Sequence, residues 1–227
     1  MYRGDRLEKP VPFLISAPFL PGGDDNPGAC PHMSFKREEA MVLDMLPAAE
    51  GQIAAGRFVL RPVRASDAGL IAHHAGDRRV AEATQNIPHP FPPGAAEAYV
   101  ARAMKHERPG SVWVLDGALT GLAEVLGVIS LKPMEVKAGQ GGQSEVAYWV
   151  APAFWNTGIA SEAVRALIAA NPLGDRTYFA EVFQDNPGSA RVLVNNGFQY
   201  LGDAEAFSVA RDAVVPTWTY IRKLADA

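Results

Sequence analysis

Two successive strand–helix units constrain the fold of this chain more than any other part of its sequence. The segment SEVAYWV, residues 144–150, is predicted to be a strand, and an amphipathic helix follows Gly158 and ends near Ala170. A second strand, RTYFAEVFQ at 176–184, leads directly into a short helix within NPGSARVLVNNGF. Such alternation is typical of an α/β or α+β domain whose sheet carries helices on its faces.

Both predicted helices have an apolar side and clear end signals. The first carries one stripe at α-helical spacing, which is expected to pack on the sheet: Ala160, Ala163, Val164, Leu167 and Ile168. Asn171 and Pro172 are expected to end it. In the second helix we expect Asn186 to be the N-cap and Gly197 to mark the end. Its inward residues are predicted to be Ala190, Leu193 and Val194.

The chain before residue 144 is expected to supply further strands and two helices. RFVLRPV, from Arg57, alternates like a strand, and Ser66 is the expected N-cap of a helix that turns Leu70 and Ile71 inward. A helix in AAEAYVARAMKHE and a β-hairpin of SVWVLDG and LGVISLK follow. TWTYIRKL is predicted to be a last strand. The whole predicts one α/β (α+β) domain over 51–227, with a mixed sheet flanked by helices.

Residues 1–50 have a different composition from the rest of the chain. The stretch PGGDDNPGACPH is rich in proline, glycine and aspartate and offers little to build a core from. We interpret the region as an N-terminal appendage. It could be a flexible arm, an arm docked on a partner subunit, or sequence translated upstream of the true start, with Met33 and Met41 as candidate starts.

Charge and cysteine content exclude several classes of protein. The formal net charge of -4 argues against a general nucleic-acid-binding surface. No apolar run is long enough to cross a bilayer, so we expect no membrane partner. The single cysteine, Cys30, fits a reducing, cytoplasmic location. No cluster of ligands suggests a metal, because the adjacent His73 and His74 cannot hold one ion from the same helix face.

The start of the first helix carries unusually small side chains. In Trp155-Asn156-Thr157-Gly158-Ile159-Ala160 a glycine precedes backbone N–H groups that lack intrahelical partners, and these favour a phosphate or pyrophosphate. The stretch is not a Walker loop, since no Lys-Ser/Thr follows, and it lacks the three-glycine spacing of a dinucleotide fingerprint. A glycine turn needed only for geometry is the alternative.

The two units together resemble the GNAT acetyltransferase superfamily, in particular its RimJ/RimL-type branch. The family's acyl-CoA loop, Arg/Gln-x-x-Gly-x-Gly/Ala, is matched by residues 155–160, with tryptophan in the first place. Tyr148-Trp149-Val150 before the loop, Ser161-Glu162-Ala163 after it and the motif from Asn186 to Phe198 also look like this branch. The resemblance covers about residues 57–224.

The resemblance implies a GNAT fold whose two central parallel strands splay apart to admit acetyl-CoA, a cosubstrate whose pantetheine arm pairs with the first of these strands. It also implies a set of cofactor-binding residues: Trp149, Val150, Asn156, Gly158, Ile159, Ala160, Ser161, Asn186 and Asn195. The reaction it implies is direct attack of a primary amine on the thioester, with no metal. The acceptor could be a protein N-terminus or a small-molecule amine, and a homodimer is compatible with it.

Catalytic roles follow from that reaction. Glu145 is our first choice for the general base, with Glu124 and Glu181 as alternatives, and a solvated strand-end charge as the other interpretation of Glu145. Many GNAT enzymes protonate the leaving thiolate with a tyrosine at the position that Leu193 occupies here. Ser189 could supply that hydrogen bond instead, or be an ordinary first-turn residue. The Val150 N–H is expected to polarise the thioester carbonyl.

Two other functions compete with this one. The missing tyrosine is compatible with a non-catalytic GNAT module that binds acyl-CoA as a sensor or regulator. A flavin- or nucleotide-binding α/β protein would leave the second helix and its Asn-Gly-Phe ending unexplained. We interpret His89, between Pro88 and Pro90, as a loop residue near the expected entrance for the acceptor.

Overall fold

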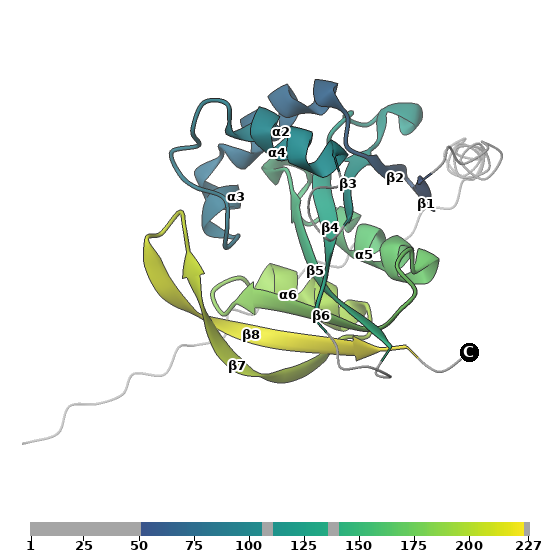
Figure 1. Cartoon of the computed structure of the whole chain (residues 1–227), viewed down its shortest axis with the longest axis vertical. Coiled ribbons are helices and arrows are strands. Elements are labelled where there is room, and N and C mark those ends of the chain that lie inside the picture. Colours follow the sequence, from purple (N-terminus) through teal and green to yellow (C-terminus); the bar gives the residue numbers. More distant parts are fainter. Residues whose placement is uncertain (1–50, 106–110, 136–140, 225–227) are drawn as a thin grey trace, which may run out of the picture.

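One mixed sheet organises the molecule. The computed structural model describes residues 51–105, 111–135 and 141–224, and within them eight strands lie in the order β1-β2-β3-β4-β5-β6-β8-β7 (Figure 1). In these residues β5 and β6 pair in parallel and the other neighbours are antiparallel. The predicted sheet type is therefore confirmed. The strands are β1 (Ile53–Ala55), β2 (Phe58–Pro62), β3 (Ser111–Asp116), β4 (Gly127–Pro133), β5 (Gly142–Val150), β6 (Asp175–Phe183), β7 (Gln199–Ser208) and β8 (Ala213–Lys223).

Helices cover both faces of this sheet. α2 and α4 lie over β3 and β4, whereas α5 and α6 lie on the other face, α5 beside β1 and β5 and α6 beside β6 (Figure 1). The α-helices are α2 (Ala68–Ala75), α3 (Arg78–Glu82), α4 (Ala95–Met104), α5 (Ile159–Ala170) and α6 (Pro187–Asn195). The 3-10 turns are η1 (Ala65–Asp67), η2 (Ala118–Thr120) and η3 (Pro152–Phe154).

The sequence interpretation missed β1, α3 and β7. β1 and α3 have only three and five residues, too few to show a period. β7 reads QYLGDAEAFS, which mixes residues that are uncommon in strands, Gly202, Asp203 and Glu205, with apolar ones. It forms because β8 pairs with it along its length, with an irregularity between Tyr200 and Gly202. Tertiary pairing overrides local preference here.

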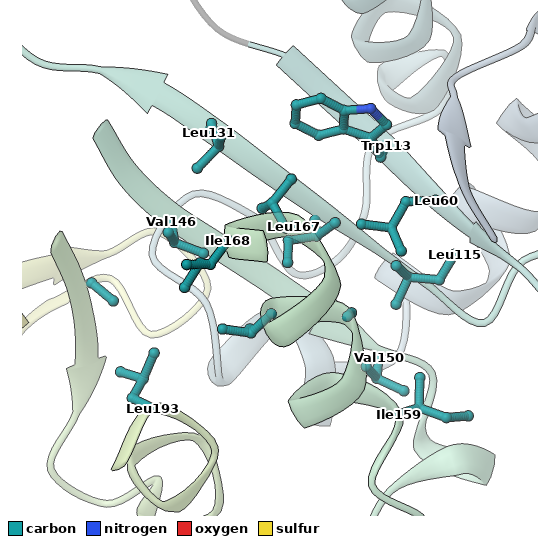
Figure 2. Close-up of a cluster of buried hydrophobic side chains, with 14 of the residues drawn as sticks. Leu60, Trp113, Leu115, Leu131, Val146, Val150, Ile159, Leu167, Ile168 and Leu193 are labelled. Atoms are coloured by element: carbon teal, nitrogen blue, oxygen red, sulfur yellow. The ribbon is translucent and has the colours of Figure 1, made fainter. Parts of the chain in front are cut away.

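The main core lies between the sheet and α5. Ala163, Val164, Leu167 and Ile168 are buried as predicted, while Ile159 takes the first place in the stripe and Ala160 is only half-buried. Figure 2 shows Leu167 and Ile168 among side chains from the strands. Each fully buried branched side chain contributes roughly 1.5–3 kcal/mol. This packing fixes the start of α5 against the carboxyl end of β5.

The predicted cap of α2 is wrong. η1 precedes α2, and the residue at the α2 N-cap position is Asp67, whose carboxylate instead accepts hydrogen bonds from Arg64 N (2.7 Å) and the Arg61 guanidinium. Ser66 therefore caps nothing. Ile71 is buried as expected, but Leu70 is 37% exposed, because it lies a residue away from the side that faces the sheet.

Both end signals of α6 are confirmed. The Asn186 side chain accepts a hydrogen bond from Ser189 N at 3.1 Å. Gly197 follows the helix with φ +76°, and Phe198 N donates to Leu193 O at 3.1 Å, which closes the last turn. Leu193 is fully buried, but Val194 is 55% exposed, so its predicted inward position is wrong.

A buried charge cluster ties β2 to η1 and β3. Arg61 is 1% exposed, and its guanidinium donates to both carboxylate oxygens of Asp67 at 2.8 Å and to Asp116 Oδ2 at 2.5 Å. Burial works against ionisation of Asp67, but the hydrogen bonds from Arg61 and Arg64 N outweigh it and hold the pKa of Asp67 below its ordinary value. The bond between Arg61 and Asp67 therefore stabilises the fold only while Asp67 is charged.

Two predictions concern the N-terminal appendage and membrane-spanning segments. The appendage of residues 1–50 lies outside the described residues, so its division from 51–227 stays a prediction. In the described part of the chain, no helix is long and apolar enough to span a membrane.

Candidate active site in the split between β5 and β6

The two parallel strands separate partway along their length. Their register runs from Gly142 opposite Asp175 to Glu145 opposite Phe179. β5 continues to Val150 and β6 to Phe183 without pairing to each other. The sheet is thus split at its centre, and the edges of both strands beyond this point lie open.

Alternation of the β5 backbone decides which groups line the split. Ala151 N donates to Leu126 O at 2.9 Å, continuing the ladder between β5 and β4. In an antiparallel pair every second residue bonds the same neighbour, so Tyr148 and Val150 turn their N–H and C=O groups to the open edge. The Val150 carbonyl accepts the Trp155 indole N–H at 2.7 Å. The Val150 backbone N–H faces the split.

The N-terminus of α5 lies directly after this open edge. Gly158 is the N-cap, with φ +83°, a conformation that favours glycine. The first hydrogen bond of the helix runs from Glu162 N to Gly158 O at 3.0 Å. The N–H groups of Ile159, Ala160 and Ser161 come before it and have no intrahelical acceptor. They make an anion-binding helix terminus next to the split.

A side chain from the β1–β2 turn adds a positive charge at this terminus. Arg57 donates through Nε to Glu162 Oε2 and through its backbone N to Glu162 Oε1, both at 2.7 Å. Among residues beyond its own stretch of chain, a Cβ built on Gly158 would meet only Arg57 Nη2, at 3.5 Å, within 4 Å in the described part of the chain. The guanidinium therefore lies beside the glycine, and Glu162 fixes it there.

Side-chain bonds also shape the loop that leads to the helix. Thr157 Oγ1 donates to Phe154 O at 2.6 Å, and Asn156 is exposed with φ +60°. The Arg79 guanidinium of α3 lies 5.6 Å from the centre of the Trp155 ring. Trp155 is thus held by β5 on one side and approached by α3 on the other.

The residue that ties α6 to the start of α5 is Asn196, and the sequence interpretation missed it. Asn196 is 5% exposed and donates through Nδ2 to Ser161 Oγ at 2.9 Å and to Val192 O at 2.8 Å. The predicted Asn195 is exposed on the last turn of α6. Adjacent asparagines at a helix end give no sequence signal that separates them.

Tyr148 is a second residue that was not singled out for a role. Its hydroxyl oxygen lies 2.9 Å from Ser189 Oγ and 3.1 Å from Ser189 O, so its one hydrogen can be donated to either oxygen. Burial raises the pKa of Tyr148 well above its ordinary value, an effect that the hydrogen bond with Ser189 only partly offsets, so the phenol stays protonated. The first turn of α6 is therefore joined to the open part of β5.

The three candidate carboxylates lie in different places. Glu145 is at the last paired position of β5, where Lys132 Nζ is 3.7 Å from its Oε2. Glu181 lies beyond that point on β6 and is half-buried, and it accepts hydrogen bonds from Thr217 Oγ1 at 2.5 Å and Gln85 Nε2 at 2.9 Å. Glu124 is 53% exposed in the β3–β4 connection, 4.0 Å from Arg61.

The face of the sheet opposite α5 completes the surroundings. The Trp149 side chain packs with the α2–α4 cluster there, and its ring centre is 6.4 Å from that of His74. Burial, with the nearby His73, lowers the pKa of His74. His89 lines a hollow of about 570 Å³ between α2, α4 and the loop before α4. In the described residues no group of three or more histidine, cysteine or acidic side chains could hold a metal.

Comparison with known proteins gives a family match. A family model described as "Acetyltransferase (GNAT) domain" matches residues 57–199, more than half of the chain. The matched range includes β2 to β6, the split and both helix termini described above. No curated protein sequence matches the chain closely enough to count as a relative.

Solved structures show the same fold at low sequence identity. The ribosomal-protein-S5-alanine acetyltransferase from Vibrio fischeri is 18% identical, with a TM-score of 0.63, over 77% of this chain and 97% of that one. RimL, a ribosomal L7/L12 α-N-protein acetyltransferase in complex with coenzyme A, is 16% identical, with a TM-score of 0.60, over 78% of this chain and 97% of that one. The spermidine N-acetyltransferase from Vibrio cholerae, in complex with CoA and spermine, is 16% identical, with a TM-score of 0.58, over 73% of this chain and 95% of that one.

Proposed function

This chain belongs to the GNAT acetyltransferase family, and we propose that it transfers an acetyl group from acetyl-CoA to a primary amine by direct attack in a ternary complex. The observation that carries the proposal is the alignment of three features: the split between β5 and β6, the open edge of β5, and the bare start of α5 at the end of that edge. An elongated thioester ending in a pyrophosphate matches this order of features.

The helix terminus suits the pyrophosphate of acetyl-CoA. In the proposal the N–H groups of Gly158, Ile159, Ala160 and Ser161 donate to phosphate oxygens, and the Arg57 guanidinium adds a positive charge beside them. Asn196 holds Ser161 in place from α6. The other proposed cofactor-binding residues are those predicted from the sequence: Asn156, Asn186 and Asn195.

The open edge of β5 suits an extended amide-containing chain. Backbone groups of Tyr148 and Val150 can pair with the pantetheine amides as a further strand would. Trp149 takes part through its backbone, since its side chain lies on the other face. We propose that the Val150 N–H donates to the thioester carbonyl and stabilises the negative charge that develops there.

Position favours Glu181 over Glu145 as the general base. Both side chains lie on the face opposite α5, because Ala180 and Val182, on either side of Glu181, belong to the α5 cluster. Glu145 precedes the split and faces Lys132, whereas Glu181 lies on the open arm of β6. Glu181 would take a proton from the ammonium acceptor, directly or through water, to give the neutral amine that attacks.

Ser189 is the proposed donor to the departing sulfur. The next inward residue on α6, Leu193, is apolar and fully buried, so it offers no proton. The electron pair of the broken C–S bond stays on sulfur, which takes one proton to become a thiol. The amine lone pair forms the new N–C bond, and nitrogen loses its excess protons to the base and solvent.

The class of acceptor follows from the chemistry and the neighbours together. Structures that share the fold are named for acting on ribosomal proteins and on spermidine, which carry primary amines. We propose that the acceptor here is likewise a protein N-terminus or a small-molecule amine. The half-buried Glu181 carboxylate, with neutral donors on both oxygens, suits a cationic amine.

The test compares Glu181→Gln with Glu145→Gln, which change the same atoms on the same face. Free thiol release with a panel of peptide and small amines gives kcat, and thermal shift gives acetyl-CoA binding. We expect Glu181→Gln to bind acetyl-CoA normally and to lose roughly 100-fold or more in kcat. A loss confined to Glu145→Gln would move the base to that residue. Unchanged kcat in both variants would contradict a carboxylate base at either of these two positions.

A regulatory function is the second candidate, favoured by the apolar Leu193 where many GNAT enzymes carry a tyrosine. In that case the chain would bind acyl-CoA as a sensor without turnover. Stabilisation by acetyl-CoA with no thiol release from any amine in the panel would establish this candidate instead of the enzyme.

A further inference from the structure

A pair of hydroxyl groups bridges the split at the level of the open β5 edge. Tyr148 comes from β5 beyond the last residue paired with β6, and Ser189 comes from the first turn of α6. The Tyr148 side chain leans toward α6, because its oxygen is 2.9 Å from Ser189 Oγ and 3.1 Å from Ser189 O. The bridge joins the strand that would carry the thioester to the helix that carries the proposed proton donor.

Hydrogen counting allows this bridge two arrangements. A tyrosine hydroxyl has one hydrogen, and both acceptors within reach belong to Ser189. When that hydrogen points to Ser189 O, the serine hydroxyl donates to Tyr148. When it points to Ser189 Oγ, the nearer of the two oxygens, the serine hydrogen can turn to another acceptor. Asn186 Oδ1 accepts the Ser189 backbone N–H at 3.1 Å, which fixes the turn that carries the serine.

We propose that Tyr148 is a positioning residue for acetyl transfer: its hydroxyl donates to Ser189 Oγ and turns the serine hydrogen into the split, toward the sulfur that leaves. This inference rests on the proposed function and assigns a role that the reaction scheme above lacks. Burial keeps the phenol protonated, so Tyr148 remains a donor over the neutral and mildly alkaline range.

Protons balance in the proposed step. Sulfur keeps the electron pair of the broken C–S bond and takes the Ser189 hydroxyl proton. Ser189 regains a proton from solvent, and the buried Tyr148 keeps its own. Nitrogen forms the amide bond with its lone pair and loses its two excess protons, one to Glu181 before the attack and one to solvent after it. No oxidant, metal or further reactant is needed.

The test is a double-mutant cycle with a matched control. Tyr148→Phe removes only the hydroxyl, and we expect kcat to fall about tenfold while KM for acetyl-CoA and its thermal shift stay unchanged. The kcat of Ser189→Ala should fall at least as far. The kcat of the double variant should fall no further than that of Ser189→Ala, because Tyr148 acts through Ser189. Ser189→Thr, which keeps the hydroxyl, should retain the Tyr148 dependence.

Tyr178→Phe is the control for a general structural loss. Tyr178 is also buried and donates to Asn171 Oδ1 at 2.6 Å, but it lies on the paired part of β6. We expect Tyr178→Phe to lose about as much stability as Tyr148→Phe and to keep an unchanged kcat. Wild-type kcat in Tyr148→Phe, or losses from Tyr148→Phe and Ser189→Ala that multiply in full, would overturn this inference alone. No thiol release by the unmodified chain would overturn the proposed function with it.

Discussion

A single glycine gives the start of α5 its shape. Gly158 has φ +83°, and the preceding loop residue Asn156 also has a positive φ of 60°. Asparagine tolerates that region and glycine occupies it freely, so the chain can turn from β5 into α5 without a bulky side chain at the turn. The open space around Gly158, apart from Arg57, is what the proposed phosphate contacts need.

Gly158→Val tests this residue directly. A β-branched side chain at this φ is strained by about 1–2 kcal/mol and would project into the space proposed for the pyrophosphate. We expect a folded protein whose melting temperature falls by several degrees and which no longer binds acetyl-CoA in calorimetry.

Gly174→Val is the matched control, because Gly174 has φ +67° and open surroundings beyond the C-terminal end of α5. It should lose similar stability and keep acetyl-CoA binding. If folded Gly158→Val binds as the unmodified chain does, the turn serves geometry alone.

Sequence patterns identified some site residues and not others. The Asn186 cap and the Gly158 turn carry signals of spacing and residue type, and the structure has both where they were predicted. Tyr148 and Asn196 carry no such signal, because their importance lies in contacts with Ser189 and Ser161, which are distant in the chain. Only the packing of α6 against α5 and β5 reveals them.

At the scale of elements, the register of the parallel pair decides the site. The sequence predicts β5 and β6 as strands, and the family resemblance predicts that they diverge, but neither locates the last pair. That pair is Glu145 and Phe179, and it places Glu145 before the split and Glu181 after it. A shift of two residues in register would bring Glu181 opposite Glu145, so the proposal of Glu181 as the base depends on the register in the structure.

The β2–η1–β3 tie depends on charge, and Asp67→Asn tests it. The substitution removes the charged Asp67 partner of the buried Arg61. We therefore expect the free energy of unfolding at pH 7, measured by urea titration, to be about 3 kcal/mol lower. Because the folded pKa of Asp67 is lowered, its contribution is complete above the unfolded value of about 3.9 and is lost as pH falls through the folded pKa.

The difference in free energy of unfolding between the unmodified chain and Asp67→Asn should therefore become smaller below about pH 4. Glu82→Gln is the control, since Glu82 pairs with Arg78 at the surface and such pairs contribute only about 0.3–0.5 kcal/mol. A gap of the same size at pH 7 and pH 3, or no gap at pH 7, would contradict the role given to Asp67.

The whole molecule joins two halves at the split. The half formed by β1 to β5 carries α2 and α4, and the half formed by β6 to β8 carries α6, while α5 packs across the main core (Figures 1 and 2). At the far end, the β7–β8 turn contacts α3 and its following loop, where Val209 N donates to Gln85 O at 2.9 Å and Arg211 Nη2 to Glu82 O at 2.6 Å. The halves are therefore connected around the open edges.

Composition and strand–helix order were enough to predict the fold class, because amphipathic helices beside strands permit few arrangements. They could not predict the β7 strand, whose pairing with β8 compensates for weak local preference. The division between residues 1–50 and 51–227 remains a prediction, and comparison of the full chain with residues 51–227 in the assay below also tests it.

Acetyl-CoA binding is the central claim, and thermal shift measures it most directly. Melting temperatures are compared with acetyl-CoA, CoA and NAD at equal concentration. Both CoA compounds should raise the melting temperature by an amount that grows with their concentration, and NAD should not. The absence of stabilisation by either CoA compound would contradict the central claim.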